Sequence, residues 1–415
     1  MSSDSDLPAN PTHTGLTAQG WNWTVTQLKA QLTATPDQKV YVGQMYVTTS
    51  GATEIDVVMH EGRLSPVLTI AVKGEVSVDW GDNTTPDTVT GTSETTRLAV
   101  NHTYASAGNY TICISKVSGT YSFYGSSSYT LLRKNTTGSE NRVYANCIQS
   151  IRIGTGVEII RDYAFYYCYS LASITIPSSV TSIQSYVFAY CYSLASITIP
   201  SSVTSIGSNA FYYCFYIKNI TIPSSVASIG NNAFQCCYSL ASITIPSGVT
   251  SIADSAFYYC NSLENITIPS NVTSIGSNAF AYCCILSSIT IPSGVTSIGN
   301  NAFQNCYSLA SITLPSSVTS IGNYAFYGCY SLVSVAIPSN VTSIGDYAFS
   351  NCYGIKEYHF QPTSVPTAGT TIFKSIVSDA VIYVPFSSDH SILEAYKAAD
   401  NWSTYATYMQ EEPQS

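Results

Sequence analysis

Charged residues are scarce in this sequence of 415 residues: Asp, Glu, Lys and Arg make up only 9% of it, and the net charge is −9. Proteins that bind nucleic acids neutralise the phosphates with clusters of Lys and Arg. No such cluster occurs anywhere in the sequence. The composition therefore excludes nucleic acid as the expected partner.

Long apolar runs are also missing. A membrane-spanning helix needs about 18 or more consecutive apolar residues, and the sequence contains no such run. Its first residues, MSSDSDLPANP, lack the basic start and the apolar stretch of a secretory leader. We therefore expect no membrane span and no leader within this sequence.

Residues that carry catalytic or metal chemistry are few and scattered. A zinc site needs closely spaced Cys and His residues, and a glycosidase needs two carboxylates that face one cleft. Neither pattern occurs in the repeated part of the chain, where Asp162, Asp254, Glu264 and Asp346 are isolated. Asp79 and Asp82 have the oxygen ligands that calcium prefers, but two carboxylates are too few, and a role in a turn is favoured. We expect no catalytic residue, no cofactor and no metal, and therefore no enzyme.

What the sequence does contain is a strict period of 23 residues. It is kept by prolines from Pro177 to Pro338, by cysteines from Cys168 to Cys352 and by phenylalanines from Phe165 to Phe349. A fixed period of this length, held by three residue types, predicts a solenoid in which each turn contacts only its neighbours. Solenoids present extended surfaces, so the repeat favours recognition over catalysis.

One turn shows how the repeat would fold. Ile174 and Ile176 flank Thr175, an alternation that predicts a very short strand, and Pro177 ends it because proline cannot donate to a ladder. Phe165 and Cys168 are three residues apart, so a short helical turn would point both toward the core. Stacked turns would then bury columns of Ile, Leu, Phe and Cys.

The spacing Leu171-x-x-Ile174-x-Ile176, with segments such as IPSSVTSIG and AFYYC, resembles the Treponema-type (BspA-like) leucine-rich repeat. The resemblance covers residues 148–385 and implies a mainly β solenoid of about ten turns with short helices. The end units are atypical, as expected where a stack faces water. One of them holds Phe373, in a degenerate turn that we expect to be weakly packed. Residues 386–411 predict a short capping helix around Leu393–Ala399.

The front of the chain lacks the repeat and alternates as antiparallel β structure does. Two of its segments, VSVDWGDN (76–83) and HTY (102–104) followed by GNYT (108–111), resemble the PKD domain, an immunoglobulin-like β-sandwich. Asn83 stands where that family has glycine. Residues 40–62 suggest a hairpin added to the same sheet. The expected domains are 1–39, a flexible lead; 40–118, the PKD-like sandwich; 119–147, a linker and N-terminal cap; 148–385, the solenoid; and 386–415, a C-terminal cap and tail.

Thirteen cysteines invite a disulfide interpretation. In-register turns, however, point their Cβ atoms the same way, and a disulfide needs converging ones. We expect the nine cysteines of the column, Cys168 to Cys352, to be reduced and buried, and to act as small apolar side chains of the core. Cys236 and Cys284 fall beside the column, and we expect them to be more exposed.

Comparison of the repeats within the chain separates a uniform surface from a variable one. The outward strand positions are Ser or Asn and then Thr in almost every turn, as in Ser173 and Thr175. Around each phenylalanine and cysteine the residues vary among Tyr, Asn, Ser, Gln and Ala, a palette that binding loops also use. The candidate ligand-binding residues are Tyr166, Tyr167, Tyr190, Tyr212, Tyr213, Tyr258, Tyr259 and Tyr282. The alternative is that these tyrosines only cover the edge of the core.

The expected function is non-enzymatic extracellular recognition or adhesion. The family resemblance implies binding to host or matrix proteins at a cell surface, and the tyrosines would also suit glycans. Two alternatives stay open: a phage tail or virion adhesin, and a non-catalytic accessory of a glycan-degrading system. The sequence predicts neither the ligand nor the oligomeric state.

Overall fold

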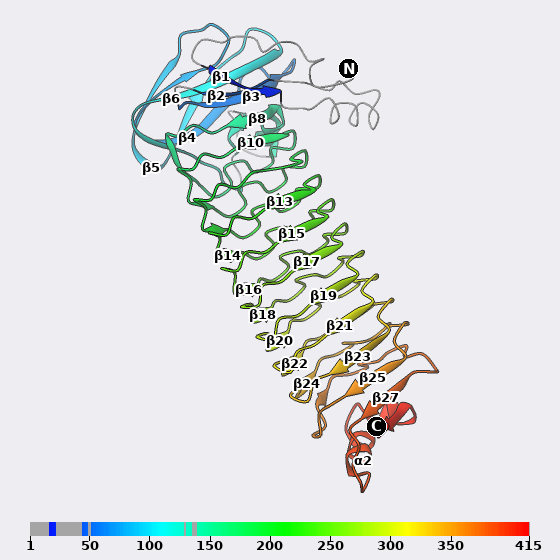
Figure 1. Ribbon diagram of the computed structural model, residues 1–415. Coiled ribbons are helices and arrows are strands. Elements are labelled where there is room, and N and C mark those ends of the chain that lie inside the picture. Colours follow the sequence, from blue (N-terminus) through cyan, green and yellow to red (C-terminus); the bar gives the residue numbers. More distant parts are fainter. Residues whose placement is uncertain (1–15, 22–43, 49–50, 128–129, 135–138, 415) are drawn as a thin grey trace.

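The computed structural model describes residues 16–21, 44–48, 51–127, 130–134 and 139–414. A β domain at the N-terminal end leads into a long stack of turns, and a small helical cap closes the C-terminal end (Figure 1). The mainly β solenoid expected from the 23-residue period is confirmed. The flexible lead expected over residues 1–39 lies largely outside the described residues, except for β1 (Leu16–Trp21).

Almost every turn contributes a short strand to a first parallel sheet, and the turn of Thr198 contributes only single bridges. Isoleucine at the middle position points into the core, and the polar residues on either side of it are exposed. This alternation confirms the strand predicted from Ile174. The strands on this side are β8 (Ile148–Arg152), β10 (Ser173–Thr175), β13 (Asn219–Thr221), β15 (Ser242–Thr244), β17 (Asn265–Thr267), β19 (Ser288–Thr290), β21 (Ser311–Thr313), β23 (Ser334–Ile337), β25 (Glu357–Phe360) and β27 (Val381–Val384).

A second parallel sheet, which the sequence did not reveal, runs along another side of the stack (Figure 1). Its strands have only two residues in most turns, as in Ser182–Ile183 paired with Ser205–Ile206. They are β9 (Val157–Ile160), β11 (Ser182–Ile183), β12 (Ser205–Ile206), β14 (Ser228–Ile229), β16 (Ser251–Ile252), β18 (Ser274–Ile275), β20 (Ser297–Ile298), β22 (Ser320–Ile321), β24 (Ser343–Ile344) and β26 (Thr367–Ala368).

The third side of each turn is a run of tight turns, so the short helical turn predicted there is wrong. The backbone N–H groups of Tyr163, Phe165 and Tyr167 donate to carbonyls of the next turn at 3.0 Å. A helix would have used these groups internally. Tyr163 and Tyr167 both have left-handed backbone conformations, each with φ of 61°. The prediction that Phe165 and Cys168 face the core is confirmed, because both are fully buried.

The cysteine column is buried, and every cysteine in the chain is unpaired. The thiols do more than fill space, because each one from Cys191 onward donates to the carbonyl of a phenylalanine 26 residues earlier. The bond from Cys260 to Phe234, for example, measures 3.2 Å. Burial raises the pKa of Cys260 well above its usual value, so the thiol stays protonated and remains a donor.

The expected exposure of the two cysteines beside the column is wrong for one of them. Cys236 is buried, with only 3% of its surface exposed. Its thiol forms hydrogen bonds with the side chains of Tyr238 and Tyr213. Cys284 is partly exposed, as expected, and contacts Asn261.

The front domain consists of β1, β2 (Gln44–Thr48), β3 (Thr53–Met59), β4 (Val67–Asp79), β5 (Asp87–Asn101), β6 (Gly108–Phe123), β7 (Leu132–Arg133) and the 3-10 helix η2 (Ser139–Cys147). The hairpin suggested for residues 40–62 does not form, because β2 pairs with β1 while β3 pairs with β6 and β8. Strand β6 continues five residues past the expected domain end at 118.

Two strands of this front domain close the N-terminal end of the solenoid. β3 pairs antiparallel with β8 of the first sheet, and β6 pairs parallel with β9 of the second, so one sheet runs in the order β10-β8-β3-β6-β9-β11. This covers edges that would otherwise present unpaired backbone groups. Arg152 on β8 forms ion pairs with Glu54 (2.6 Å) and Asp56 (2.9 Å) on β3. The front domain is therefore joined to the repeats through continuous hydrogen bonding.

The C-terminal cap consists of α2 (Ser391–Ala398), η3 (Ser403–Tyr408) and β28 (Met409–Glu411). The predicted capping helix is thus confirmed. The expected weak packing around Phe373 is wrong: the side chain is fully buried, and its ring lies 4.6 Å from Tyr358, 5.1 Å from Tyr405 and 6.1 Å from Trp402. Tyr358 belongs to the last regular turn, whereas Tyr405 and Trp402 come from the cap and replace the missing next turn.

Candidate interaction surface

Tyrosines of successive turns stack on one another along the solenoid. The residue before each column cysteine forms the first column: the ring of Tyr190 lies 4.5 Å from Tyr167 and 5.2 Å from Tyr213, with interplanar angles of 10° and 23°. Cys236 occupies the next place, and the stack resumes with Tyr259 and Tyr282 at 4.3 Å.

The residue after each column cysteine forms a second column. Tyr169, Tyr192, Phe215 and Tyr238 stack with centroid distances of 4.6, 4.4 and 4.9 Å. Asn261 and Cys284 occupy the next two places, so this stack ends at Tyr238.

Edge-to-face contacts join the columns into one group. Tyr166 contacts Tyr167 and Tyr190 at 4.2 and 5.6 Å, and the break at Cys236 is bridged by Tyr238, which contacts Tyr259 at 6.4 Å. We call the connected rings the aromatic network; its members are Tyr163, Tyr166, Tyr167, Tyr169, Tyr186, Tyr190, Tyr192, Tyr212, Tyr213, Phe215, Tyr238, Tyr258, Tyr259 and Tyr282.

All eight tyrosines selected from the sequence lie in the aromatic network. Tyr166 is the most buried, at 9% exposure, and the other seven are half-buried. The sequence missed the stacking, which depends on contacts between residues 23 apart. It also left out six members, although Tyr169, Tyr192, Phe215 and Tyr238 share one repeat position and were visible as a column.

The hydroxyl groups of Tyr212 and Tyr259 in the aromatic network stay neutral. Burial raises the pKa of Tyr212 to about 12, and neighbouring Tyr213 adds to the shift. Burial also raises the pKa of Tyr259 to about 12, with Tyr282 as the next cause. At physiological pH these side chains therefore present uncharged hydroxyls that both donate and accept hydrogen bonds.

Stacking decides which part of each ring can meet a ligand. Rings about 4.5 Å apart and nearly parallel cover each other's faces. A sugar that stacks on an aromatic side chain needs an uncovered face, and the interior rings offer only edges and hydroxyls. Such a surface suits polar and aliphatic groups of a protein better than the flat side of a sugar ring.

The backbone conformation adds a second constraint on these positions. The two columns that contain Tyr163 and Tyr167 have φ between 54° and 72° in every turn from Tyr163 to Asn351. Asn and Gly adopt this left-handed region most readily, whereas bulky residues are strained there. Asn therefore occurs at some of these positions, such as Asn209 and Asn301, because it tolerates the left-handed conformation, independently of any ligand.

More exposed aromatic residues lie outside the aromatic network. Tyr307, Tyr330 and Tyr353 stack in the second column at 5.0 and 5.4 Å, and Tyr330 and Tyr353 are 44% and 50% exposed. Tyr216 is 59% exposed. These residues were not selected from the sequence, because nothing in it distinguishes an exposed ring from a half-buried one.

The cation site considered for Asp79 and Asp82 is a turn. Asp79 accepts the backbone N–H of Gly81 at 2.9 Å, and Asp82 accepts the hydroxyl of Thr84 at 2.6 Å. Asn83, which stands where the PKD motif has glycine, adopts a left-handed φ of 65°, a conformation that Asn tolerates better than most residues. Asp82 also bonds to His102 at 2.8 Å. In the described part of the chain no group of three His, Cys, Asp or Glu could hold a metal ion.

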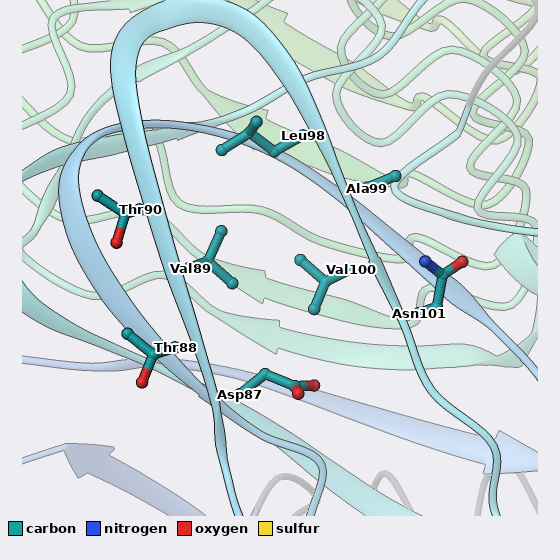
Figure 2. A pocket seen from close by; sticks show the side chains of 8 residues that line it. All are labelled: Asp87, Thr88, Val89, Thr90, Leu98, Ala99, Val100 and Asn101. Carbon is teal, nitrogen blue, oxygen red and sulfur yellow. The ribbon is translucent and has the colours of Figure 1, made fainter.

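A shallow cavity of about 380 Å³ lies against β5. Figure 2 shows Val89 and Val100 on opposite sides of it, with Leu98 above them. Its one ionisable residue, Asp87, already accepts the indole N–H of Trp80 at 2.7 Å. The cavity therefore has no second ionisable side chain to act together with Asp87. No helix among the described residues has the length and hydrophobicity needed to cross a membrane.

Comparisons with known proteins agree with the repeat. The model of the BspA type leucine rich repeat region matches residues 116–240, 181–310 and 273–396. Similar solved structures include a leucine-rich repeat protein from Bacteroides ovatus (24% identity, 72% of this chain and 97% of that chain, TM-score 0.39) and a leucine rich cell surface protein from Faecalibacterium prausnitzii (28% identity, 71% and 90%, TM-score 0.42). The pneumococcal vaccine antigen PcpA is similar too (18% identity, 70% and 82%, TM-score 0.42). No curated protein sequence gave a significant match.

Proposed function

This chain belongs to the BspA-type leucine-rich repeat family, and we propose that it is a non-enzymatic recognition protein that binds a protein partner through its aromatic network. We place it at a cell surface or in the extracellular space, because the family resemblance is to surface proteins. The front domain, which we propose to be PKD-like, positions the repeats rigidly through β3, β6 and Arg152.

The observation that carries this proposal is the presence of tyrosine where the backbone disfavours it. Tyr167, Tyr190 and Tyr213 all have φ between 60° and 65°. The left-handed conformation costs a residue with a side chain about 1–2 kcal/mol, and Asn305 and Asn351 show that a smaller residue fits the same column. Each ring pair returns roughly 0.5–1.5 kcal/mol, so the several ring contacts of a residue such as Tyr190 offset the strain. Asn avoids the strain and still fits the column, so the fold does not require tyrosine there, whereas recognition gives a reason for it.

The kind of partner follows from which surfaces of the rings are free. The exposed edges and neutral hydroxyls of Tyr190, Tyr213 and Tyr259 combine apolar area with hydrogen bonding at little cost in side-chain entropy. Tyrosine is also among the residues enriched at hot spots of protein interfaces. A host or matrix protein is thus favoured over a glycan as the partner of the aromatic network.

An array of matrix proteins and glycans, probed with the full chain, would identify the partner. The double variant Tyr190→Asn/Tyr213→Asn would then remove two central rings and place Asn in a backbone conformation it prefers. If both rings act as anchors that contribute roughly 1–2 kcal/mol each, we expect binding to weaken by about 30- to 900-fold.

Tyr347→Asn is the matched control, because Tyr347 has the same left-handed conformation (φ 56°) and lies outside the aromatic network. It should leave binding unchanged. Circular dichroism of each variant should show an intact fold. Unchanged binding by the double variant, or an equal loss in the control, would refute the assignment of the aromatic network as the interface.

A further inference from the structure

The first parallel sheet presents an ordered array of hydroxyl groups. Thr221, Thr244 and Thr267 are in register on β13, β15 and β17, and Thr290 pairs with Thr313 on β19 and β21. Single bridges add Thr175 and Thr198 to the same line. All seven threonines are exposed. We call this surface, with the Ser or Asn two residues before each threonine, the hydroxyl face.

These threonine hydroxyls have no partner in the part of the chain that the structure describes. Several threonines that precede strands of the second sheet behave differently: the hydroxyls of Thr204, Thr273 and Thr319 donate to carbonyls of the preceding turn at 3.2–3.4 Å. On the hydroxyl face the one side-chain hydrogen bond joins Ser242 to Asn219 at 3.3 Å. The hydroxyl face therefore has hydrogen-bonding capacity that the fold does not use.

The hydroxyl face is also uncharged. Neither of its two outward positions carries an ionisable residue between Ser173 and Thr313. The residue directly before each outward Ser or Asn is charged in only two turns, as Lys218 and Glu264, which have opposite signs. A charged ligand desolvated against this surface would find no counter-charge, which is costly. The face therefore fits a neutral ligand.

The uniformity of the hydroxyl face from turn to turn further narrows the class of ligand that it can bind. Every turn offers nearly the same contacts, so a globular protein, whose surface differs from place to place, would gain little orientation from them. A ligand that itself repeats can make the same contact at each turn. Hydroxyls act as both donors and acceptors, and so does a sugar. Strands lie about 4.7–4.9 Å apart, a step comparable to the advance of an extended polysaccharide chain per sugar.

We propose that the hydroxyl face is a second binding site, distinct from the aromatic network, for a neutral linear polysaccharide that lies along the solenoid axis. The seven threonines define six steps, or roughly 29 Å, so the site accommodates about six sugars. Many weak and equivalent contacts would give an affinity that rises with chain length up to this limit.

Affinity gel electrophoresis of the full chain tests the proposal. The probes are neutral polymers, namely hydroxyethylcellulose, laminarin and mannan, with polygalacturonate as the anionic comparison. We expect at least one neutral polymer to retard the protein, and oligosaccharides of that polymer to compete better with increasing length up to about six sugars. Failure of every neutral polymer to retard the folded protein would overturn the proposal.

The triple variant Thr198→Val/Thr221→Val/Thr244→Val removes three hydroxyls while keeping the shape and strand preference of the side chain. Retardation should weaken by roughly tenfold or more, as the loss of three hydrogen bonds implies. The matched control, Thr181→Val/Thr250→Val/Thr296→Val, alters three exposed threonines of the other sheet and should bind as the wild type does.

Three outcomes would overturn this assignment: unchanged binding by the triple variant, an equal loss in the control, or a loss confined to Tyr190→Asn/Tyr213→Asn. The last would move the polysaccharide to the aromatic network. The proposal does not depend on the protein partner proposed above, because a variant of one surface leaves the other intact.

Discussion

The structure makes a specific prediction about Phe373, the phenylalanine of the last, irregular turn. Its side chain is fully buried and contacts five rings, those of Phe349, Tyr358, Phe360, Trp402 and Tyr405. A phenylalanine in the middle of the stack, Phe257, contacts two rings at 5.7 and 5.5 Å. The cap thus surrounds its phenylalanine at least as completely as a central turn does.

The magnitude follows from burial. Replacing a buried phenylalanine by alanine costs about 3–5 kcal/mol, including the cavity that remains. Aromatic pairs add roughly 0.5–1.5 kcal/mol each when well oriented. Phe373→Ala should therefore cost about 4 kcal/mol, and no less than Phe257→Ala.

Two tryptophans allow the loss to be located by fluorescence during urea unfolding. Trp402 packs against Phe373 in the cap, and Trp80 is buried in the front domain. Emission from the cap, isolated in a background in which the other three tryptophans (Trp21, Trp23 and Trp80) are replaced by Phe, should shift to lower urea in Phe373→Ala, while circular dichroism reports the repeats. A cost for Phe373→Ala well below that for Phe257→Ala would show that the cap is loosely packed in solution, and the reasoning would fail.

Three further predictions concern thiols and the domain junction. In native protein, Cys284 and Cys113, the only partly exposed cysteines, should react with a thiol reagent first, and Cys236 should react only after unfolding; early labelling of Cys236 would contradict its burial. Arg152→Met should lower the free energy of unfolding by about 2–3 kcal/mol, less than the 3–5 kcal/mol typical of fully buried pairs, because Asp56 is partly exposed. An unchanged unfolding free energy in calorimetry would contradict this prediction. Burial raises the pKa of Asp56, but the contacts with Arg152 outweigh burial and hold the pKa below the ordinary 3.8. The ion pair therefore stabilises the fold above pH 3.8, and this stabilisation should be lost as the pH falls through the lowered pKa of Asp56. The Arg152→Met protein should lack this acid dependence.

The repeat and its core could be predicted from the sequence because their signals are local and repeated. Isoleucines two residues apart, such as Ile243 and Ile245, and a phenylalanine and cysteine three apart identify the buried positions in every turn. The second sheet gave no signal, because a strand of two residues is too short to show alternation. Its pairing depends on the next turn, as between Ile183 and Ile206.

The tight turns were mistaken for a helical turn for a related reason. Phe165 and Cys168 have helical spacing, but the N–H of Phe165 bonds to Val187 in the following turn. A hydrogen bond between residues 22 apart cannot be read from a window of one turn. The left-handed conformation of Tyr163 follows from this pairing, and so does the stacking of Tyr163 on Tyr186. The candidate residues were thus found by variation among the repeats, whereas their mutual geometry came only from the structure.

The extent of the aromatic network bears on how many partners it can hold. It spans six turns, from that of Cys168 to that of Cys283, and five steps of strand spacing amount to roughly 24 Å. A standard protein interface covers about 800 Å² on each partner, which corresponds to a square with sides of about 28 Å. One globular protein would therefore cover the whole network, so a second copy could not bind beside it. The stacked rings of Tyr307, Tyr330 and Tyr353 lie beyond the break at Asn261 and Cys284. A stoichiometry above one partner per chain would therefore require a separate interface at these three rings.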